Sequence, residues 1–471
     1  MFDAFIQWAN TLIWDHLLIY VLLGAGAYFT IRTRFLQFRR FGYFWSALSH
    51  SREGAGQGIS GFQAFCIGLA SRVGTGNIAG VAIALTLGGP GAIFWMWMVA
   101  LVGMATAFIE ATLAQLFKVQ QPDGTFRGGP AYYIERGLGS RLWGSVFAVL
   151  LIFTFGLTFN AVQANTIAET LNSAHGIPPL FTAIGLVVLA APVLFGGMRA
   201  IARVAEWMLP IMALAYVALA LVIIGLHVQK IPEVLSLIVR SAFGVDQAAA
   251  GAFGGVAAAL LNGVKRGLFS NEAGMGSAPN AAATATVGHP ASQGFIQALG
   301  VFIDTIIVCS ATAFIVLASD LYDPARPAEI AGATLTQASV AAQFGTAGMA
   351  FMTAVIFLFA FSSILGNYAY ADGNLTYLGA SAPMVQGFKV IVLLAVAGGC
   401  LGELPIVWAL ADVAMGLMAL VNLTAIILLG RWAFGALADY EQALPQGPPM
   451  FDSQANPHLP DQIGTGVWRR G

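Results

Sequence analysis

Two interruptions of apolar stretches hold the residues of this chain that could do chemistry. The first, residues 68–80, reads GLASRVGTGNIAG, and the second, residues 261–280, reads LNGVKRGLFSNEAGMGSAPN. Each places glycines and polar groups inside a run long enough to cross a bilayer. Because hydrocarbon offers no hydrogen bonds, a helix broken there must line a cavity or bury its break in protein. The two stretches therefore predict a site between two broken membrane helices.

The ends of such broken helices can bind ions of both signs. Free N–H groups and the positive helix end attract a carboxylate, whereas free C=O groups and the negative end attract a cation. Glycine permits unusual dihedrals and the close approach of a small ligand. A zwitterionic amino acid bound with a sodium ion matches both ends, so the stretches indicate an amino-acid carrier.

Close packing of helices is the alternative explanation for these glycines. Residues 76–80 match the small-xxx-small pattern of helix contacts, so glycine alone does not establish a site. In the second stretch, Lys265, Arg266 and Glu272 are costly in lipid unless they are paired or line water. A dinucleotide-binding loop is excluded, because the first stretch follows no predicted strand.

The composition indicates an all-α polytopic membrane protein. Of the 471 residues 58% are hydrophobic and 9% charged, whereas ~25% charged is typical of soluble proteins. The net charge of -1 argues against a nucleic-acid partner. Cys66, Cys309 and Cys400 are far apart in apolar runs and suggest neither disulfides nor a metal site. Since no Ser-His pair or metal-ligand cluster is found, we expect no enzyme.

Runs of about 20 apolar residues predict about 11 membrane helices. The predicted spans are residues 10–31, 61–86, 90–117, 142–170, 178–196, 205–228, 251–286, 292–318, 346–371, 385–402 and 405–430. The first span follows no basic n-region, so we expect it to be uncleaved and not a signal peptide.

Basic residues predict the orientation, because short loops rich in Lys and Arg stay in the cytoplasm. With the N-terminus outside, the basic residues of segments 32–52, 118–141 and 199–203 and of the C-terminus all lie in the cytoplasm. The outer side then holds only Lys230, Arg240 and Arg326.

Three segments outside the spans carry further expectations. Residues 34–50 mix aromatic residues with arginines, which is typical of a helix on the cytoplasmic surface, with a plain basic loop as the alternative. Residues 327–344 are too polar to span the membrane and predict a short helix over the outer mouth. From residue 436 the chain turns polar and proline-rich, so we expect a disordered tail.

Acidic residues within the spans need partners. For Asp304 we expect pairing with Lys265 or Arg266, as an ion or gate site or as a structural charge pair. Glu110 is expected to meet headgroup-level water or a cytoplasmic arginine. Asp412 lies near a predicted span end, where solvation is the simpler account.

The two interruptions occupy corresponding positions of two halves, which is the best sequence indication of a transporter site. About five spans fit between them, and because five is odd the second half has the opposite topology. The expected divisions are an N-terminal segment (residues 1–60), a first five-helix repeat (61–230), an inverted repeat (231–432) and a cytoplasmic tail (433–471).

At these residues the sequence resembles the alanine/glycine:cation symporter family, also called sodium:alanine symporters. The matching motifs are VGTGNIAGVA (73–82), GGPGAIFWMW (88–97), GGPAYY (128–133), VQAN (162–165) and SNEAGMGSAP (270–279). The resemblance extends to about residue 431. It implies a LeuT-type fold of five helices and an inverted five after one extra N-terminal helix, in a bacterial inner membrane. It also implies alternating-access import of a small neutral amino acid of the alanine/glycine class with sodium.

The resemblance also implies the site residues. Those that meet the substrate are Thr75, Gly76, Asn77, Gln163, Phe269, Met275, Gly276 and Asn367. Among them, Phe269 and Met275 bound the substrate side chain, and Gln163 contacts the amino acid. A sodium ion would lie between the carbonyls of Ala70 and Val73 and the hydroxyls of Ser362 and Ser363, and such oxygens suit a hard cation.

One segment departs from the family pattern, in which a Trp and then a Glu follow Ile-Leu-Gly. Here Asn367 and Asp372 stand near these places. Asn enlarges the pocket and adds a donor and an acceptor, so glutamine or serine is an alternative substrate. A proton-coupled carrier that uses Asp304 or Glu272 is a further alternative, and a channel is another.

Overall fold

Apolar helices make up nearly the whole molecule, because a backbone in hydrocarbon must satisfy its own N–H and C=O groups. The computed structural model describes residues 2–52, 58–245, 252–319, 321–323, 330, 332–402, 404–446, 449–461, 463 and 466–468. In these residues the only strands are two short pairs, β1 with β4 and β2 with β3. The all-helical class predicted from composition is confirmed.

The elements follow one another in two sets. The first comprises α1 (Phe2–Ile13), η1 (Trp14–Leu18), α2 (Ile19–Arg32), α3 (Leu36–Arg39), α4 (Phe41–Ser49), β1 (Ile59–Ser60), α5 (Gly61–Arg72), η2 (Gly76–Gly80), α6 (Val81–Gly88), α7 (Gly91–Leu116), β2 (Val119–Gln120), β3 (Phe126–Arg127), α8 (Pro130–Leu138), α9 (Arg141–Phe153), η3 (Thr154–Thr158), α10 (Phe159–His175), α11 (Pro179–Phe195) and α12 (Gly197–Leu226). The second comprises η4 (Val228–Lys230), α13 (Ile231–Ala242), α14 (Ala252–Asn271), α15 (Ala278–Thr284), β4 (Ala285–Thr286), α16 (Pro290–Val301), η5 (Phe302–Cys309), α17 (Ser310–Leu317), α18 (Gly332–Tyr377), α19 (Ala382–Leu401), α20 (Leu404–Ala443) and η6 (Leu444–Gln446).

Eight described helices are long and apolar enough to cross a membrane, and α5 with η2 and α6 forms a ninth that is bent by 47°. The two other predicted spans coincide with α11, which has 17 residues, and with the pair α14 and α15. Every predicted span therefore falls on helix. The count of eleven remains a prediction.

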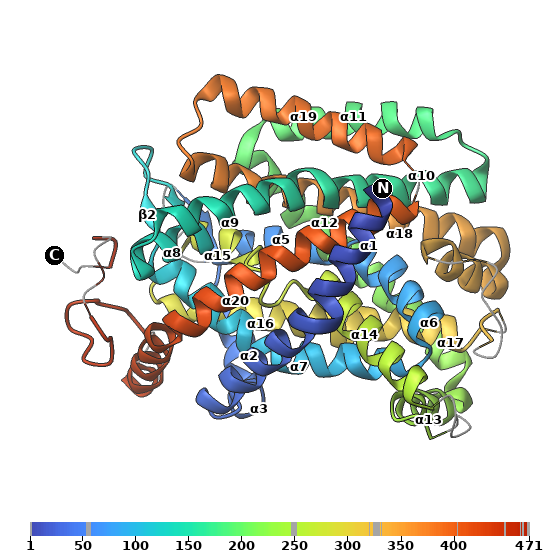
Figure 1. Cartoon of the computed structure of the whole chain (residues 1–471), viewed down its shortest axis with the longest axis horizontal. Helices are drawn as coiled ribbons and strands as arrows, with labels where there is room; N and C mark the ends of the chain where they lie inside the picture. Colours follow the sequence, from blue (N-terminus) through green and yellow to red (C-terminus); the bar gives the residue numbers. More distant parts are fainter. Residues whose placement is uncertain are drawn as a thin grey trace.

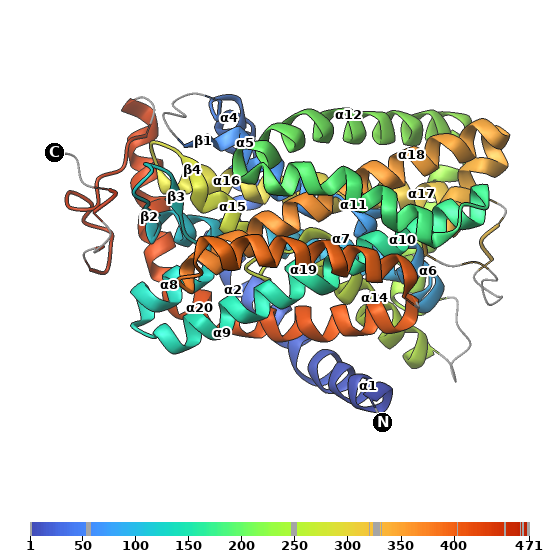
Figure 2. The same cartoon turned by 90° about the horizontal axis from the view of Figure 1, so that it is seen from above.

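The long helices run along the horizontal axis of Figure 2, and loops gather at the two ends. The left end holds α4, α8, both strand pairs and the red C-terminal segment, and in Figure 1 this segment again lies at the left. A cavity at this end is lined by residues 58–59, 123, 125–127, 196 and 198–199. Loops that were predicted to lie on one membrane face therefore do meet. Which face this is stays a prediction, and Arg326 lies outside the described residues.

The two broken helices run in opposite directions. From α5 to α6 the chain runs left to right in Figure 2, and from α14 to α15 it runs right to left. At the left end β1 pairs in parallel with β4, with Ile59 opposite Ala285. Helix α5 begins directly after β1 in a capping box, in which Ser60 and Gln63 each accept the backbone N–H of the other.

Two predicted surface segments are helical. Residues 36–49 form α3 and α4, with the Phe44 ring buried in the protein. Helix α18 breaks at Gly345, where φ is 60°, so residues 332–344 form a separate short helix. The Thr336 hydroxyl of this helix donates to the carbonyl of Ile78 at 3.4 Å, which places the short helix against the first broken helix.

The expectation of a disordered tail was wrong for the described residues. Helix α20 continues to Ala443, and the later chain folds back on the left end of the molecule. There the Phe451 N–H donates to the Gly288 carbonyl at 2.9 Å, and the Trp468 indole N–H donates to the Gln115 carbonyl at 2.8 Å. The tail composition is polar overall, but the Phe451 and Trp468 side chains are buried, and their rings pack against each other with centroids 5.5 Å apart.

Two cations of α14, the buried Arg266 and the largely buried Lys265, share the carboxylate of Asp412 on α20. Arg266 Nη2 lies 2.5 Å and Lys265 Nζ 2.7 Å from its oxygens. Our expectations that these cations pair with Asp304 and that Asp412 is solvated were therefore wrong. The reason is the rotation of α14 about its axis, which turns Lys265 and Arg266 towards α1 and α20. The hydrogen bond from Lys265 Nζ to Asn10 Oδ1 of α1, at 2.7 Å, shows this orientation.

We predict that Asp412→Asn strongly destabilises the protein. The substitution leaves two buried cations without a counter-charge, and breaking a buried pair costs about 3–5 kcal/mol. Unfolding in detergent micelles measures the loss. The matched control is Glu135→Gln, which breaks the exposed pair with Arg141 and should cost about 0–1 kcal/mol. Equal effects of the two substitutions would contradict the prediction.

Candidate functional site

The first break lies at the end of α5, and polar groups take over its backbone bonds. The Gly74 N–H donates to the Arg72 carbonyl at 2.9 Å and to Asn77 Oδ1 at 3.0 Å. In a regular helix it would donate to the Ala70 carbonyl, which is therefore released from the helix ladder. The chain then continues as the π-helical turn η2, so the predicted interruption is confirmed.

The second break follows α14 and is bonded by a carboxylate. The backbone at this break has positive φ values at Glu272 (57°), Gly274 (89°) and Gly276 (81°). The two glycines adopt such values without strain, whereas they are uncommon for a residue such as Glu272. Glu110 of α7 accepts the N–H groups of Gly274 and Gly276, each at 3.2 Å. The expectation that Glu110 meets headgroup water was thus wrong: its carboxylate replaces the helical acceptors lost at this break.

Four of the predicted substrate residues meet between the breaks. The Thr75 N–H donates to Gln163 Oε1 at 3.1 Å, and Gly76 lies so close to Phe269 that a Cβ on it would be 3.1 Å from that ring. The Phe269 ring packs between Phe159 and Trp408, with centroids 4.6 and 4.7 Å away. The Thr75 hydroxyl is buried and has no hydrogen-bond partner among the described residues.

Asn77, the fifth predicted substrate residue in this group, faces Asp304. Its Nδ2 donates to Asp304 Oδ1 at 2.6 Å. The Ser270 and Thr305 hydroxyls both donate to Oδ2 at 2.7 Å. Asp304 lies in the π-helical segment η5 and is fully buried, so its carboxylate connects both broken helices through uncharged donors.

The predicted sodium ligands also gather at the first break. The Ser363 hydroxyl lies 2.9 Å and the Ser362 hydroxyl 3.4 Å from the released Ala70 carbonyl. Val73 caps α5 with non-helical dihedrals (φ -76°, ψ 81°). Carbonyl and hydroxyl oxygens are the donor set that a hard cation takes, so the residues present fit a sodium ion as co-substrate.

The structure places three predicted substrate residues elsewhere. Gly276 lies against Asn422 and Pro130, where an added Cβ would be 2.7–2.8 Å from their side chains. Met275 is buried in the core at the same break. Neither has a described contact with Thr75.

Asn367, the third of these residues, is bound within a buried chain of hydrogen bonds. Its Oδ1 accepts from the Ser71 hydroxyl at 2.7 Å, and its Nδ2 donates to Asn160 Oδ1 at 3.0 Å. The Ser71 hydroxyl also lies 2.8 Å from Glu272 Oε1. The amide of Asn367 therefore connects α5, α10 and α14.

Sequence reasoning gave Glu110 the wrong partners and did not assign to this region Ser71, Asn160, Thr305, Cys309 and Asn422. A usable signal existed for most of them, because polar side chains at membrane depth are expensive and usually bonded. Arg72 belongs to the same region. It is buried, donates from Nη1 to the Gln297 carbonyl at 3.1 Å, and its charge attracts the carboxylates of Glu110, Glu272 and Asp304.

The fold is similar to that of a solved transporter. The manganese transporter of Eremococcus coleocola, in its complex with an aromatic bis-isothiourea substituted compound, aligns over 91% of this chain and 83% of its own with a TM-score of 0.51. The two sequences are 13% identical, so the likeness concerns the fold alone. Together with the two helix breaks, it defines the class as an all-helical protein with up to nine candidate membrane spans among the described residues.

The particular family follows from sequence. The pattern of the sodium:alanine symporter family matches residues 1–453, and the chain belongs to that family. It is 48% identical to the probable sodium/glutamine symporter GlnT of Bacillus subtilis, over 94% of this chain and 92% of that protein. It is 37% identical to the sodium/alanine symporter AgcS of Methanococcus maripaludis, over 91% of this chain and 95% of that protein. It is 38% identical to the sodium/proton-dependent alanine carrier protein of Bacillus sp. PS3, over 83% of this chain and 90% of that protein.

We predict that Gly74→Ala abolishes transport. A Cβ at Gly74 would overlap the Ser363 hydroxyl and lie 3.0 Å from Gln163 Oε1, so it would occupy the space between the predicted sodium and substrate residues. Uptake into proteoliposomes should fall to background. The control is Gly185→Ala on α11, where a Cβ would meet nothing within 4 Å. Normal uptake by Gly74→Ala would show that this space is not used.

Proposed function

We propose that the protein is a sodium-coupled importer of a small neutral amino acid that works by alternating access. One observation carries the proposal: the first break places the released Ala70 carbonyl and the Thr75 hydroxyl, which has no described partner, in the buried core, where Gly76 lies against Phe269 of the second broken helix. The Thr75 hydroxyl lacks a described partner beside the η2 helix start, where a substrate carboxylate is attracted. The Ala70 carbonyl faces the Ser363 hydroxyl, where sodium is attracted.

The proposed architecture is a LeuT-type pair of inverted five-helix repeats after one extra N-terminal helix. The opposite directions of the two broken helices support it. Alternating access then proceeds by movement of one set of helices against the other around the site. The proposed location is the bacterial inner membrane, with the N-terminus outside and the C-terminus in the cytoplasm.

Alanine and glycine are the first proposed substrates, and glutamine or serine is the second candidate. The contact of Gly76 with Phe269 leaves little room on that side of the site, which favours a small side chain. The likeness to a relative named a probable sodium/glutamine symporter favours the second candidate. The smaller Asn367 in place of a Trp also favours the second candidate, although its amide is hydrogen-bonded to Ser71 and Asn160 in this conformation.

Reconstituted protein tests the coupling. An inward sodium gradient should drive accumulation of labelled alanine, and dissipating the gradient should release it. Uptake driven by a pH gradient without sodium would favour proton coupling instead, with Asp304, whose described side-chain hydrogen-bond donors are all uncharged, as the proton site. The absence of sodium-driven uptake of alanine, glycine, serine and glutamine would refute the proposal.

Ser363→Ala should weaken sodium binding. The substitution removes one of the oxygens that face the Ala70 carbonyl, and an interaction of ~1.4 kcal/mol corresponds to about tenfold in affinity. We expect the sodium concentration for half-maximal alanine uptake to rise by about that factor. Ser173→Ala on α10 is the control, because its hydroxyl bonds only to its own helix in the described structure, at the Thr170 carbonyl. An unchanged sodium dependence would remove Ser363 from the proposed site.

A further inference from the structure

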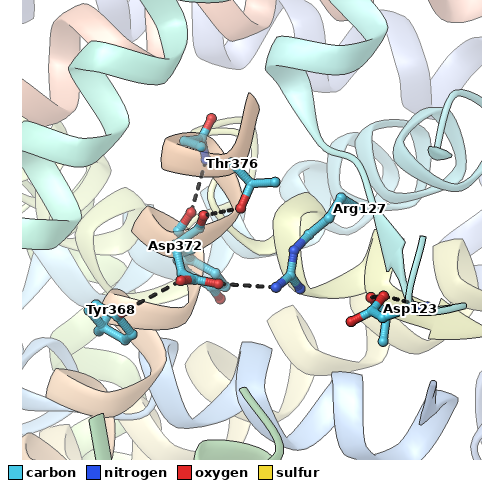
Figure 3. A network of polar contacts seen from close by, with 8 residues as sticks. Asp123, Arg127, Tyr368, Asp372 and Thr376 are labelled. Carbon is cyan, nitrogen blue, oxygen red and sulfur yellow. Dashed lines mark hydrogen bonds and ion pairs between the residues drawn. The ribbon is translucent and has the colours of Figure 1, made fainter. Parts of the chain in front are cut away.

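An ion pair closes the seam between α18 and the hairpin β2–β3 at the left end of the molecule. Arg127 of β3 contacts Asp372 of α18, with Nη2 3.1 Å from Oδ2. The Tyr368 hydroxyl donates to the other oxygen of Asp372 at 3.3 Å, and Figure 3 shows these groups converging from two elements. Both charged side chains are about five-sixths buried, with exposed fractions of 16% and 17%.

Helix α18 connects this ion pair to the helix break. Ser363 bonds to Ala70, and further along the same helix the Tyr370 hydroxyl bonds to the Gly68 carbonyl at 3.3 Å. Helices α18 and α5 therefore run antiparallel from the break towards the left end. At ~1.5 Å per residue, Asp372 lies about 14 Å from Ser363 along this seam.

The arginine of this ion pair lines a cavity of about 420 Å³. Arg127 lines this cavity together with Ile59, which precedes α5, and Thr284, which ends α15. The left halves of both broken helices thus end at the cavity that Arg127 bounds. A path from the breaks to this cavity would have to open along α5, α15 and α18.

The hairpin is built to present Arg127. Asp123 in its turn accepts the Thr125 hydroxyl at 2.6 Å and the Thr125 N–H at 3.0 Å, and Figure 3 places this turn beside the Arg127 side chain. The Thr125 hydrogen bonds lower the pKa of Asp123, so this carboxylate stays charged near neutral pH. These two hydrogen bonds therefore stabilise the turn that leads into β3.

We propose that Arg127 and Asp372 are the gate on this side of the site, and that their ion pair must break before the site opens to the cavity. The proposal rests on the proposed transport function. Neither residue touches the predicted substrate or sodium residues. Both act by positioning α18 and the hairpin.

The native cysteine Cys309 reports on this opening. Its sulfur lies 3.3 Å from Asn77 Nδ2 and 3.1 Å from the Ser270 hydroxyl, at the breaks, and it is buried. Cys66→Ala and Cys400→Ala leave Cys309 as the only cysteine. A membrane-impermeant maleimide is then added to everted or to right-side-out vesicles. It labels Cys309 only when a path opens from the outer face of the vesicle to the breaks. This measurement needs neither substrate nor sodium, so it is independent of whether sodium-driven uptake is found.

Arg127→Gln and Asp372→Asn should each raise the rate of Cys309 labelling about fivefold, the factor equivalent to ~1 kcal/mol, and only in everted vesicles. The exchanged pair Arg127→Asp with Asp372→Arg should restore a slow rate, because it rebuilds the interaction. Glu135→Gln, which breaks the exposed pair with Arg141 at the same end, should leave the rate unchanged. Thermal unfolding of each variant separates gate opening from unfolding.

Three outcomes would overturn the proposal. The first is an unchanged labelling rate in both single variants. The second is an equal rise on both faces of the membrane, which indicates general loosening. The third is a rate in the exchanged pair that remains as fast as in the single variants. If Arg127→Gln does not fold, Arg127→Lys decides the case. This variant keeps the positive charge, so the rate of Cys309 labelling should stay slow if the ion pair is the gate.

Discussion

The peptide groups freed at the two helix breaks have to be bonded by protein, because hydrocarbon provides no partners. Glu110 accepts two N–H groups of the second break, and Asn77 accepts one of the first. Gln163 accepts the Thr75 N–H. These acceptors come from α7, η2 and α10, so the breaks keep their shape only while these elements surround them.

Helix α18 relates the site to the left end of the molecule. It contributes the Ser363 hydroxyl beside the Ala70 carbonyl and, further along, the Asp372 carboxylate beside Arg127. Both contacts depend on how α18 lies against its neighbours. An ion that bonds to Ser363 and Ala70 would draw α18 and α5 together at the break, and so favour the closed seam. Such a shared element is what coupling between an ion and a conformational change requires.

The charged side chains of α14 and of η5 bond to different partners. The cations Lys265 and Arg266 meet Asp412, whereas Asp304 is bonded by an amide and two hydroxyls. A buried pair such as the first contributes little net stability, but removing one partner is costly. The second arrangement leaves a carboxylate at the breaks whose donors are all neutral. The first group therefore joins α14 to α20, and the second joins η5 to both broken helices.

The sequence alone determined where the helices lie and where two of them break. Lipid enforces long apolar runs, and the glycines with polar neighbours mark the places where such a run cannot continue, so both kinds of signal are local. The tertiary structure alone decided which polar groups meet. Asp412 and Arg266 are 146 positions apart, and Glu110 reaches a break 164 positions away. Hydropathy places such residues at membrane depth, but their partners depend on the rotation of each helix and on which helices pack together, which no local pattern encodes.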